Sequence, residues 1–124
     1  MDPLVKEFRR VYADAVTVEE PDDAAYRIRQ LNWKSGRVSL SVAAECYRHL
    51  VGGYNNFEPD MVGELSSAFP ETPIYAYMAR EGSVTIYLEV QSKFRKSVKK
   101  FIKDNWHADE ISQDKEGIIR VWWD

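Results

Sequence analysis

The chain has 124 residues, of which 44% are hydrophobic, 30% charged and 13% aromatic. This length and balance predict one soluble globular domain and exclude a disordered tail, a fibre or two separate cores. A single cysteine, Cys46, excludes an intramolecular disulfide and a cysteine-rich zinc site. The N-terminus shows no secretory signal, and no apolar run approaches the ~18 residues of a membrane span. We therefore expect a cytoplasmic protein without cofactor or metal.

Four helices are predicted along the chain. Asp2 followed by Pro3 is a favourable helix start, and the apolar spacing that follows predicts a helix over 3–15, before an acidic loop at 19–23. Apolar stripes with flanking glycine, proline or serine predict further helices over the three later segments. These segments are 43–51, 59–68 and 92–106.

Three tripeptides that end in glycine separate β-prone segments. They occupy residues 34–36, 80–82 and 115–117. Glycine adopts the left-handed conformation that three-residue hairpin loops need. The predicted hairpins join 26–33 with 37–42, 74–79 with 83–88, and 108–113 with 118–123, and the polar segment 26–32 suits an edge strand. The order α-ββ-α-α-ββ-α-ββ predicts an α+β fold, an antiparallel sheet built from three β-hairpins alternating with helices.

The middle hairpin also suggests a register. With residues 80–82 as the loop, Met78 pairs with Val84 and Ala76 pairs with Ile86. One face of the hairpin is then wholly apolar, and the other carries Tyr75, Tyr77, Thr85 and Tyr87. A slip of one residue mixes the two sets, which favours this register.

The predicted helix 92–106 carries an unusual charge. It holds six cations and one acid, Asp104, and is therefore +5 in a chain whose net charge is −3. The cations are Lys93, Arg95, Lys96, Lys99, Lys100 and Lys103. Such a helix attracts nucleic acid or an acidic protein surface. The alternatives are a merely solvated face or neutralisation by acids that follow in the chain, Asp109, Glu110, Asp114 and Glu116.

The same helix carries an apolar stripe. We expect Phe94, Val98, Phe101 and Trp106 to pack on the apolar sheet face. Residues three and four apart share one face of a helix. This packing therefore turns Lys93, Lys96, Lys100 and Lys103 outward as one row.

An aromatic surface is the second candidate binding site. Its members are Tyr75, Tyr77, Tyr87, Arg120 and Trp122. Flat aromatic rings beside a cation bind protein partners or single-stranded nucleic acid when they are exposed. The alternative is that a helix covers this sheet face and the tyrosines are half-buried.

The remaining polar residues match no catalytic or metal-binding pattern. His107 near Asp109 lacks a zinc-ligand spacing. Cys46 on an apolar stripe is expected to be buried and inert, and His49 three residues later is poorly placed to activate it. The segment 52–57 is either a contact loop or a helix stop with Phe57 in the core. We expect no catalytic residue and no metal ligand.

Three functions remain open. The favoured one is a non-catalytic binding or regulatory module that engages an anionic partner, nucleic acid or an acidic protein surface, through helix 92–106. The alternative is a protein–protein interaction or inhibitor module that uses the tyrosine-rich face, the edge strand or a homodimer. The third is a small enzyme with an unidentified pocket. The acidic net charge argues against broad coating of nucleic acid, and we expect no membrane partner.

Overall fold

The computed structural model describes residues 32–48, 53 and 55–124. The predicted helix 3–15, the acidic loop 19–23 and most of the predicted strand 26–33 lie outside these residues, as do His49 and the predicted end of helix 43–51. The described elements, in chain order, are β1 (Trp33–Ser39), α3 (Leu40–Cys46), α4 (Asp60–Ala68), β2 (Ile74–Arg80), β3 (Val84–Val90), α5 (Ser92–Asn105), β4 (Glu110–Gln113) and β5 (Ile119–Trp122).

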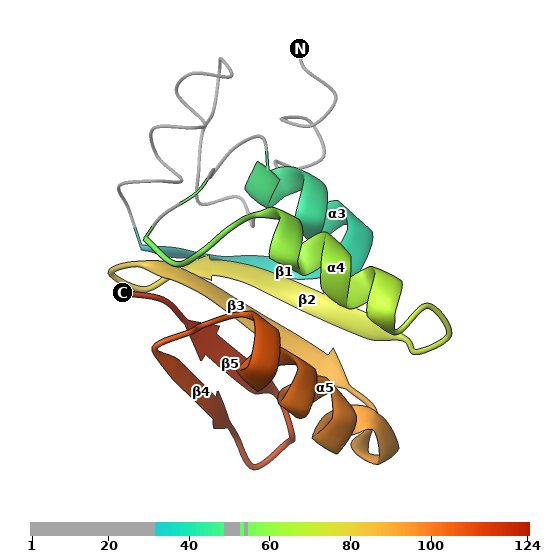
Figure 1. The fold of residues 1–124 in the computed structure, drawn as a ribbon. Coiled ribbons are helices and arrows are strands. Elements are labelled where there is room, and N and C mark those ends of the chain that lie inside the picture. Colours follow the sequence, from blue (N-terminus) through green and yellow to red (C-terminus); the bar gives the residue numbers. More distant parts are fainter. Residues whose placement is uncertain (1–31, 49–52, 54) are drawn as a thin grey trace.

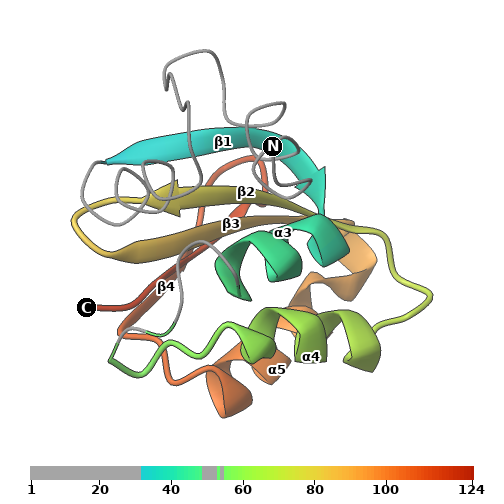
Figure 2. The same cartoon turned by 90° about the horizontal axis from the view of Figure 1, so that it is seen from above.

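The five strands form one antiparallel sheet in the order β1-β2-β3-β5-β4. All three described helices lie on one face of this sheet (Figure 1), which is seen along another direction in Figure 2. The predicted α+β class is therefore confirmed. Two of the predicted hairpins are present, β2–β3 and β4–β5.

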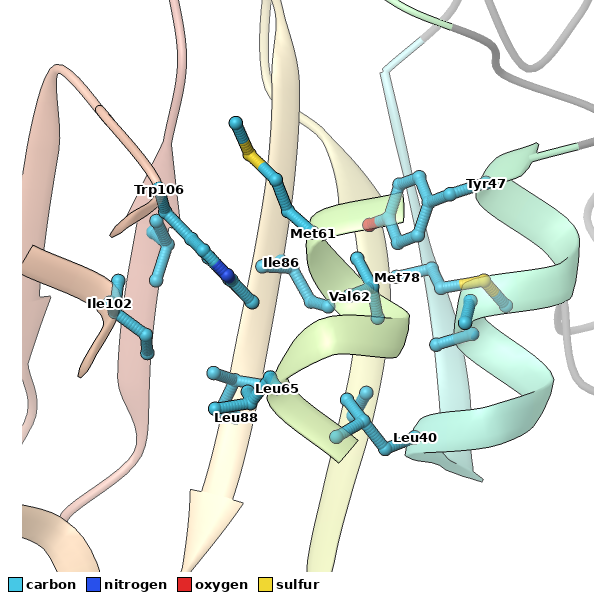
Figure 3. Close-up of a cluster of buried hydrophobic side chains, with 14 of the residues drawn as sticks. Leu40, Tyr47, Met61, Val62, Leu65, Met78, Ile86, Leu88, Ile102 and Trp106 are labelled. Atoms are coloured by element: carbon cyan, nitrogen blue, oxygen red, sulfur yellow. The ribbon is translucent and has the colours of Figure 1, made fainter. Parts of the chain in front are cut away.

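The core fills the space between the sheet and the helices. Met78, Ile86 and Leu88 from the central strands are fully buried together with Leu65 of α4 and Ile102 of α5 (Figure 3). Each such side chain contributes roughly 1.5–3 kcal/mol on burial. This apolar layer holds the helices on the sheet.

Aromatic rings close one end of the core. The ring centroids of Trp106 and Trp123 are 5.5 Å apart, and the Trp123 Nε1 donates a hydrogen bond to the Trp106 carbonyl at 2.9 Å. Phe57 meets Trp123 edge-on at 4.8 Å and is fully buried. Of the two interpretations of segment 52–57, the one that places Phe57 in the core is confirmed.

The β2–β3 hairpin has the predicted faces but a different register. Met78 pairs with Ile86 and Ala76 pairs with Leu88, two residues beyond the predicted partners. Side chains alternate with a period of two, so a shift of two residues leaves each side chain on its face. The hydrophobic pattern therefore fixes the faces and not the register.

A buried hydroxyl bridges the two central strands. Tyr47, which follows α3, donates a hydrogen bond to the Thr85 carbonyl at 2.5 Å and accepts one from the Ala79 amide at 3.3 Å. Burial raises the pKa of the Tyr47 hydroxyl far above its ordinary value, so the hydroxyl stays neutral. The bridge ties α3 to both strands near their connecting loop.

The first predicted hairpin is wrong. Residues 34–36 lie inside β1, which pairs with β2 and has a bulge between Lys34 and Arg37. The Ser35 hydroxyl accepts a hydrogen bond from the Met78 amide at 2.9 Å and so satisfies that strand donor. Glycine between β-prone segments suits a bulge as well as a turn.

Helix α3 starts earlier than predicted. Leu40 and Val42, assigned from the sequence to a strand, belong to the helix, and the Ser39 hydroxyl accepts a hydrogen bond from the Val42 amide. A serine cap of this kind stabilises a helix start, and it overrides the alternating pattern of the preceding residues.

The later elements agree closely with the sequence. The predicted helices 59–68 and 92–106 appear as α4 and α5, although the cap of α5 is Gln91 and not Ser92. The predicted last hairpin appears as β4 and β5. Gly82 and Gly117, in the two hairpin loops, have φ angles of 73° and 87°.

Replacement of Tyr47 by phenylalanine tests the bridge. Tyr47→Phe leaves a buried amide and a buried carbonyl without this partner, and we expect it to lower the free energy of unfolding by about 1–3 kcal/mol in urea denaturation. The control is Tyr75→Phe on the opposite sheet face, where a change within about 0.5 kcal/mol is expected. Equal stability of the two variants would contradict the role of the bridge.

Substitution of Gly82 tests the left-handed turn. A Cβ at this position meets no atom within 4 Å, so only the backbone conformation penalises a side chain. We expect Gly82→Val to lower the free energy of unfolding by about 1–2 kcal/mol. Gly82→Asn is the control, because asparagine tolerates this conformation better. A valine variant as stable as the asparagine variant would contradict a left-handed turn at this position.

Candidate functional site

Helix α5 is strongly amphipathic and packs as its sequence predicts. Val98 and Ile102 are buried in the core, and the half-buried Phe101 meets Phe69 edge-on with ring centroids 5.9 Å apart. Trp106, immediately after the helix, is fully buried. The predicted outward row is exposed: Lys93, Lys96, Lys100 and Lys103.

One of the six cations serves the fold. The Arg95 Nε donates to the Val90 carbonyl at 2.8 Å, and an Nη donates to the Glu116 carbonyl at 3.4 Å. The guanidinium lies so close to Gly117 that a Cβ there would collide with it. Arg95 therefore anchors α5 to the β4–β5 hairpin and is not free to meet a partner.

The other five cations differ in their contacts. The Lys99 Nζ donates to the Gln113 Oε1 at 3.2 Å, and the exposed Lys100 pairs with Asp104 at 2.8 Å. The Lys93 Nζ lies 5.0 Å from the ring centroid of Phe94. Lys96 and Lys103 form no ion pair or hydrogen bond within the described residues. These two lysines are the most available to an external anion.

Three of the four acids that follow the helix in the chain have their described contacts outside it. Asp109 accepts from the Asp124 amide at 2.8 Å, and Glu110 pairs with Arg120 at 3.2 Å. Asp114 accepts from two amides of its own turn, those of Glu116 and Ile118. Among the described contacts, no carboxylate of this hairpin forms an ion pair with a cation of α5.

Two open grooves separate α5 from β4. The larger, about 660 Å³, is lined by Lys99, Lys100, Lys103, Asp104, Ala108, Asp109 and Ile111. The smaller, about 350 Å³, is lined by Ser92, Arg95, Lys96, Lys99 and Gln113. Lys99 borders both. Lys96, Lys99, Lys100 and Lys103 thus border the space between α5 and the edge strand.

The second predicted site lies on the opposite sheet face. Tyr75, Tyr77 and Tyr87 from the central strands are half-buried, as are Arg120 and Trp122 of β5. The strand register brings Tyr77 beside Tyr87, and Tyr87 beside Arg120. The described helices all cover the other face. The structure therefore brings this predicted set together.

Charged residues that the sequence analysis did not single out complete this aromatic face. The Lys34 Nζ lies 4.0 Å from the ring centroid of Tyr87, and the Arg37 guanidinium lies 3.6 Å from that of Tyr75. Arg37 also pairs with Glu89 at 2.7 Å. The turn predicted at 34–36 conceals the place of Lys34 on this face.

Glu81 joins the other half of the aromatic face. Its carboxylate accepts hydrogen bonds from the Tyr87 hydroxyl at 2.7 Å and from Arg120 at 2.9 Å, and its carbonyl accepts from the Trp122 Nε1 at 3.0 Å. Partial burial acts to raise the pKa of Glu81, but the bonds from Tyr87 and Arg120 together lower it. Burial and the same contact with Glu81 raise the pKa of the Tyr87 hydroxyl. The face is an internally bonded network of rings and balanced charges.

Cys46 is fully buried, as expected. His107 is exposed and has a φ of 49°. Within the described residues, no three His, Cys, Asp or Glu side chains gather to hold a metal ion. Over the same part of the chain, no helix has both the length and the apolar character needed to cross a membrane.

Comparison with protein-family models, curated proteins and solved structures gives no match to this chain.

The lowered pKa of Glu81 predicts a pH-dependent contribution to stability. A carboxylate whose pKa falls on folding stabilises the protein above its unfolded pKa, about 4.3, and this stabilisation is lost as the pH falls through the folded pKa. We expect Glu81→Gln to be less stable than the parent near neutral pH. The difference in unfolding free energy, measured by urea denaturation, should shrink at pH values below the pKa of the unfolded carboxyl. A difference that stays constant with pH would contradict the assignment.

Proposed function

We propose that this protein is a non-catalytic binding module that engages an anionic macromolecule through the cationic side of α5. The observation that carries the proposal is the state of Lys96 and Lys103. Both are exposed, both lie on the helix face away from the core, and neither has an ion pair or hydrogen bond within the described chain. Their charge is available to a partner.

The distribution of acids supports the proposal. A helix face that serves solubility alone usually mixes signs, because pairs of opposite charge three or four residues apart stabilise the helix. Here Asp104 is the helix's only acid, and the carboxylates of Asp109 and Glu110 in the hairpin beside it bond elsewhere. The field of α5 is thus partly uncompensated, and lysine clusters of this kind attract anions over about one Debye length, ~10 Å at moderate salt.

A protein-interaction surface on the aromatic face is the second candidate. Its half-buried tyrosines form a flat platform on the sheet face that the described helices leave open. Three cations, Lys34, Arg37 and Arg120, stand against three acids, Glu81, Glu89 and Glu110, so the platform favours no sign of charge. Binding there is expected to tolerate salt, unlike binding at α5.

Two labelled anionic probes test the proposal, a single-stranded DNA oligonucleotide and poly-L-glutamate. We expect fluorescence anisotropy to show binding of at least one probe, with an affinity that falls as salt is raised. The double variant Lys96→Gln with Lys103→Gln should weaken this binding about tenfold or more, because it removes two ionic contacts. Its unfolding free energy should change by only a few tenths of a kcal/mol, since exposed charges contribute little to stability.

A matched control separates a local site from overall charge. Lys115 is an exposed lysine in the turn after β4 and lines neither groove. Lys115→Gln should bind the probes nearly as well as the parent, whereas Lys103→Gln, which makes the same charge change, should not. If neither probe binds the parent, or if the folded double variant binds both undiminished, α5 is not the binding surface.

A further inference from the structure

Among the described residues, some backbone groups of the edge strand β4 have no hydrogen-bond partner. The Asp114 amide donates to the Ile118 carbonyl at 3.1 Å, and in the same register Ser112 lies opposite Arg120. In antiparallel pairs, residues that bond across the ladder alternate with residues that do not. The amide and carbonyl groups of Ile111 and Gln113 therefore point away from β5, toward the open edge of the sheet.

Within the part of the chain that the structure describes, this edge has few of the features that protect sheet edges. Proline, lysine and bulges commonly prevent a further strand from pairing, and β4 contains none of them over Glu110–Gln113. The protective features present are its shortness and the charged side chain of Glu110 at its start. A short extended segment of another chain can therefore continue the hydrogen-bonded ladder, as in β-strand addition.

The helix beside the edge specifies the chemistry of such a segment. Ile111 and Gln113 pair with Val121 and Ile119, whose buried side chains face the helices, so both point to the α5 side of the sheet. There the larger groove offers lysines above an apolar floor of Ala108 and Ile111. Side chains of an added strand on this side would meet Lys99, Lys100 and Lys103.

The spacings of helix and strand are compatible. Lysines one helical turn apart are separated by about 5.4 Å along α5, and alternate residues of a strand by about 6.8 Å. Two or three acidic side chains at alternate positions of an added strand therefore reach Lys99, Lys100 and Lys103 together. The residues between them point to the opposite face.

Nucleic acid suits this edge less well. A phosphate chain has no amides to pair with Ile111 and Gln113, and it carries a negative charge at every nucleotide. Glu110 projects from the other face of β4. A peptide places its acids on one side only and so avoids Glu110.

Resting on the function proposed above, we propose that the anionic partner is an extended protein segment with acidic residues at alternate positions. This segment adds to the open edge of β4 as a sixth, antiparallel strand. Its acidic side chains bind the lysines of α5, and its backbone pairs with Ile111 and Gln113.

Selective backbone methylation of a probe peptide tests the proposal. The probe is a labelled peptide that alternates glutamate and threonine, made unmodified, with every glutamate N-methylated, or with every threonine N-methylated. All three carry the same charge. For antiparallel addition, the amides that face β4 belong to the glutamates, so N-methylation of the glutamates should weaken binding about tenfold or more, the loss of one to two hydrogen bonds. N-methylation of the threonines should leave the affinity within about twofold. If only the threonine-methylated peptide loses affinity, the strand is added in the parallel direction instead.

A change in the protein supplies the reciprocal test. Gln113→Pro removes an amide that points away from β5, a position where an edge strand tolerates proline, and Gln113→Thr keeps that amide. We expect only the proline variant to lose the alternating peptide, with circular dichroism verifying its fold. If the proline variant does not fold, the methylated peptides still test strand addition to the unchanged protein. Equal affinity for both methylated peptides would overturn strand addition while leaving the function proposed for α5 intact, whereas undiminished binding by the double lysine variant would overturn both.

Discussion

The alternation of side chains in β2 and β3 is the constraint on which the rest of the structure depends. Met78, Ile86 and Leu88 point to one side and are fully buried there beneath the helices. The tyrosines between them must then point to the other side. With the helices gathered over the apolar side, α5 turns Val98 and Ile102 inward, and its lysines face solvent as a consequence. Both candidate surfaces therefore follow from one period-two pattern.

Because α5 is anchored to the last hairpin, its lysines line a groove between the helix and β4. Arg95 bonds to the carbonyls of Val90 and Glu116, and Gly117 makes room for its guanidinium. Lys99 reaches Gln113 of β4 at 3.2 Å. These contacts set the helix alongside the edge strand, so that cations border the same space as backbone groups that have no partner among the described residues. The proposed peptide site rests on the combination of the two features, since the cations would select the charge of a bound segment and the strand edge its extended conformation.

Local patterns in the sequence predict much of this fold. Apolar spacing locates α4 and α5, glycine locates two hairpin loops, and alternation separates Tyr77 and Tyr87 from the buried face. Periodicity carries no information about a shift of two residues, which explains the error in the β2–β3 register. The bulge at 34–36 escaped prediction because its stabilising contact, from Ser35 to the Met78 amide, joins residues far apart in the chain.

The candidate sites also combine features that a local sequence pattern predicts with features that depend on long-range contacts. The composition of helix 92–106 reveals the lysine row, but not that Arg95 is committed to the hairpin or that Asp109 and Glu110 bond elsewhere. Glu81 and Lys34, which organise the aromatic face, meet its rings only after β1, β3 and β5 assemble. Long-range polar partners of this kind leave no periodic signal in the sequence.

The central claim, that an acidic partner is bound between α5 and β4, is tested most directly by mapping the bound surface. The measurement is a titration of the isotopically labelled protein with the alternating glutamate and threonine peptide, followed through amide chemical shifts in two-dimensional NMR. The account predicts that the largest shifts fall on α5 and on β4, with Ile111 and Gln113 foremost. Shifts concentrated instead at Tyr77, Tyr87 and Arg120 would contradict it and assign the binding surface to the aromatic face.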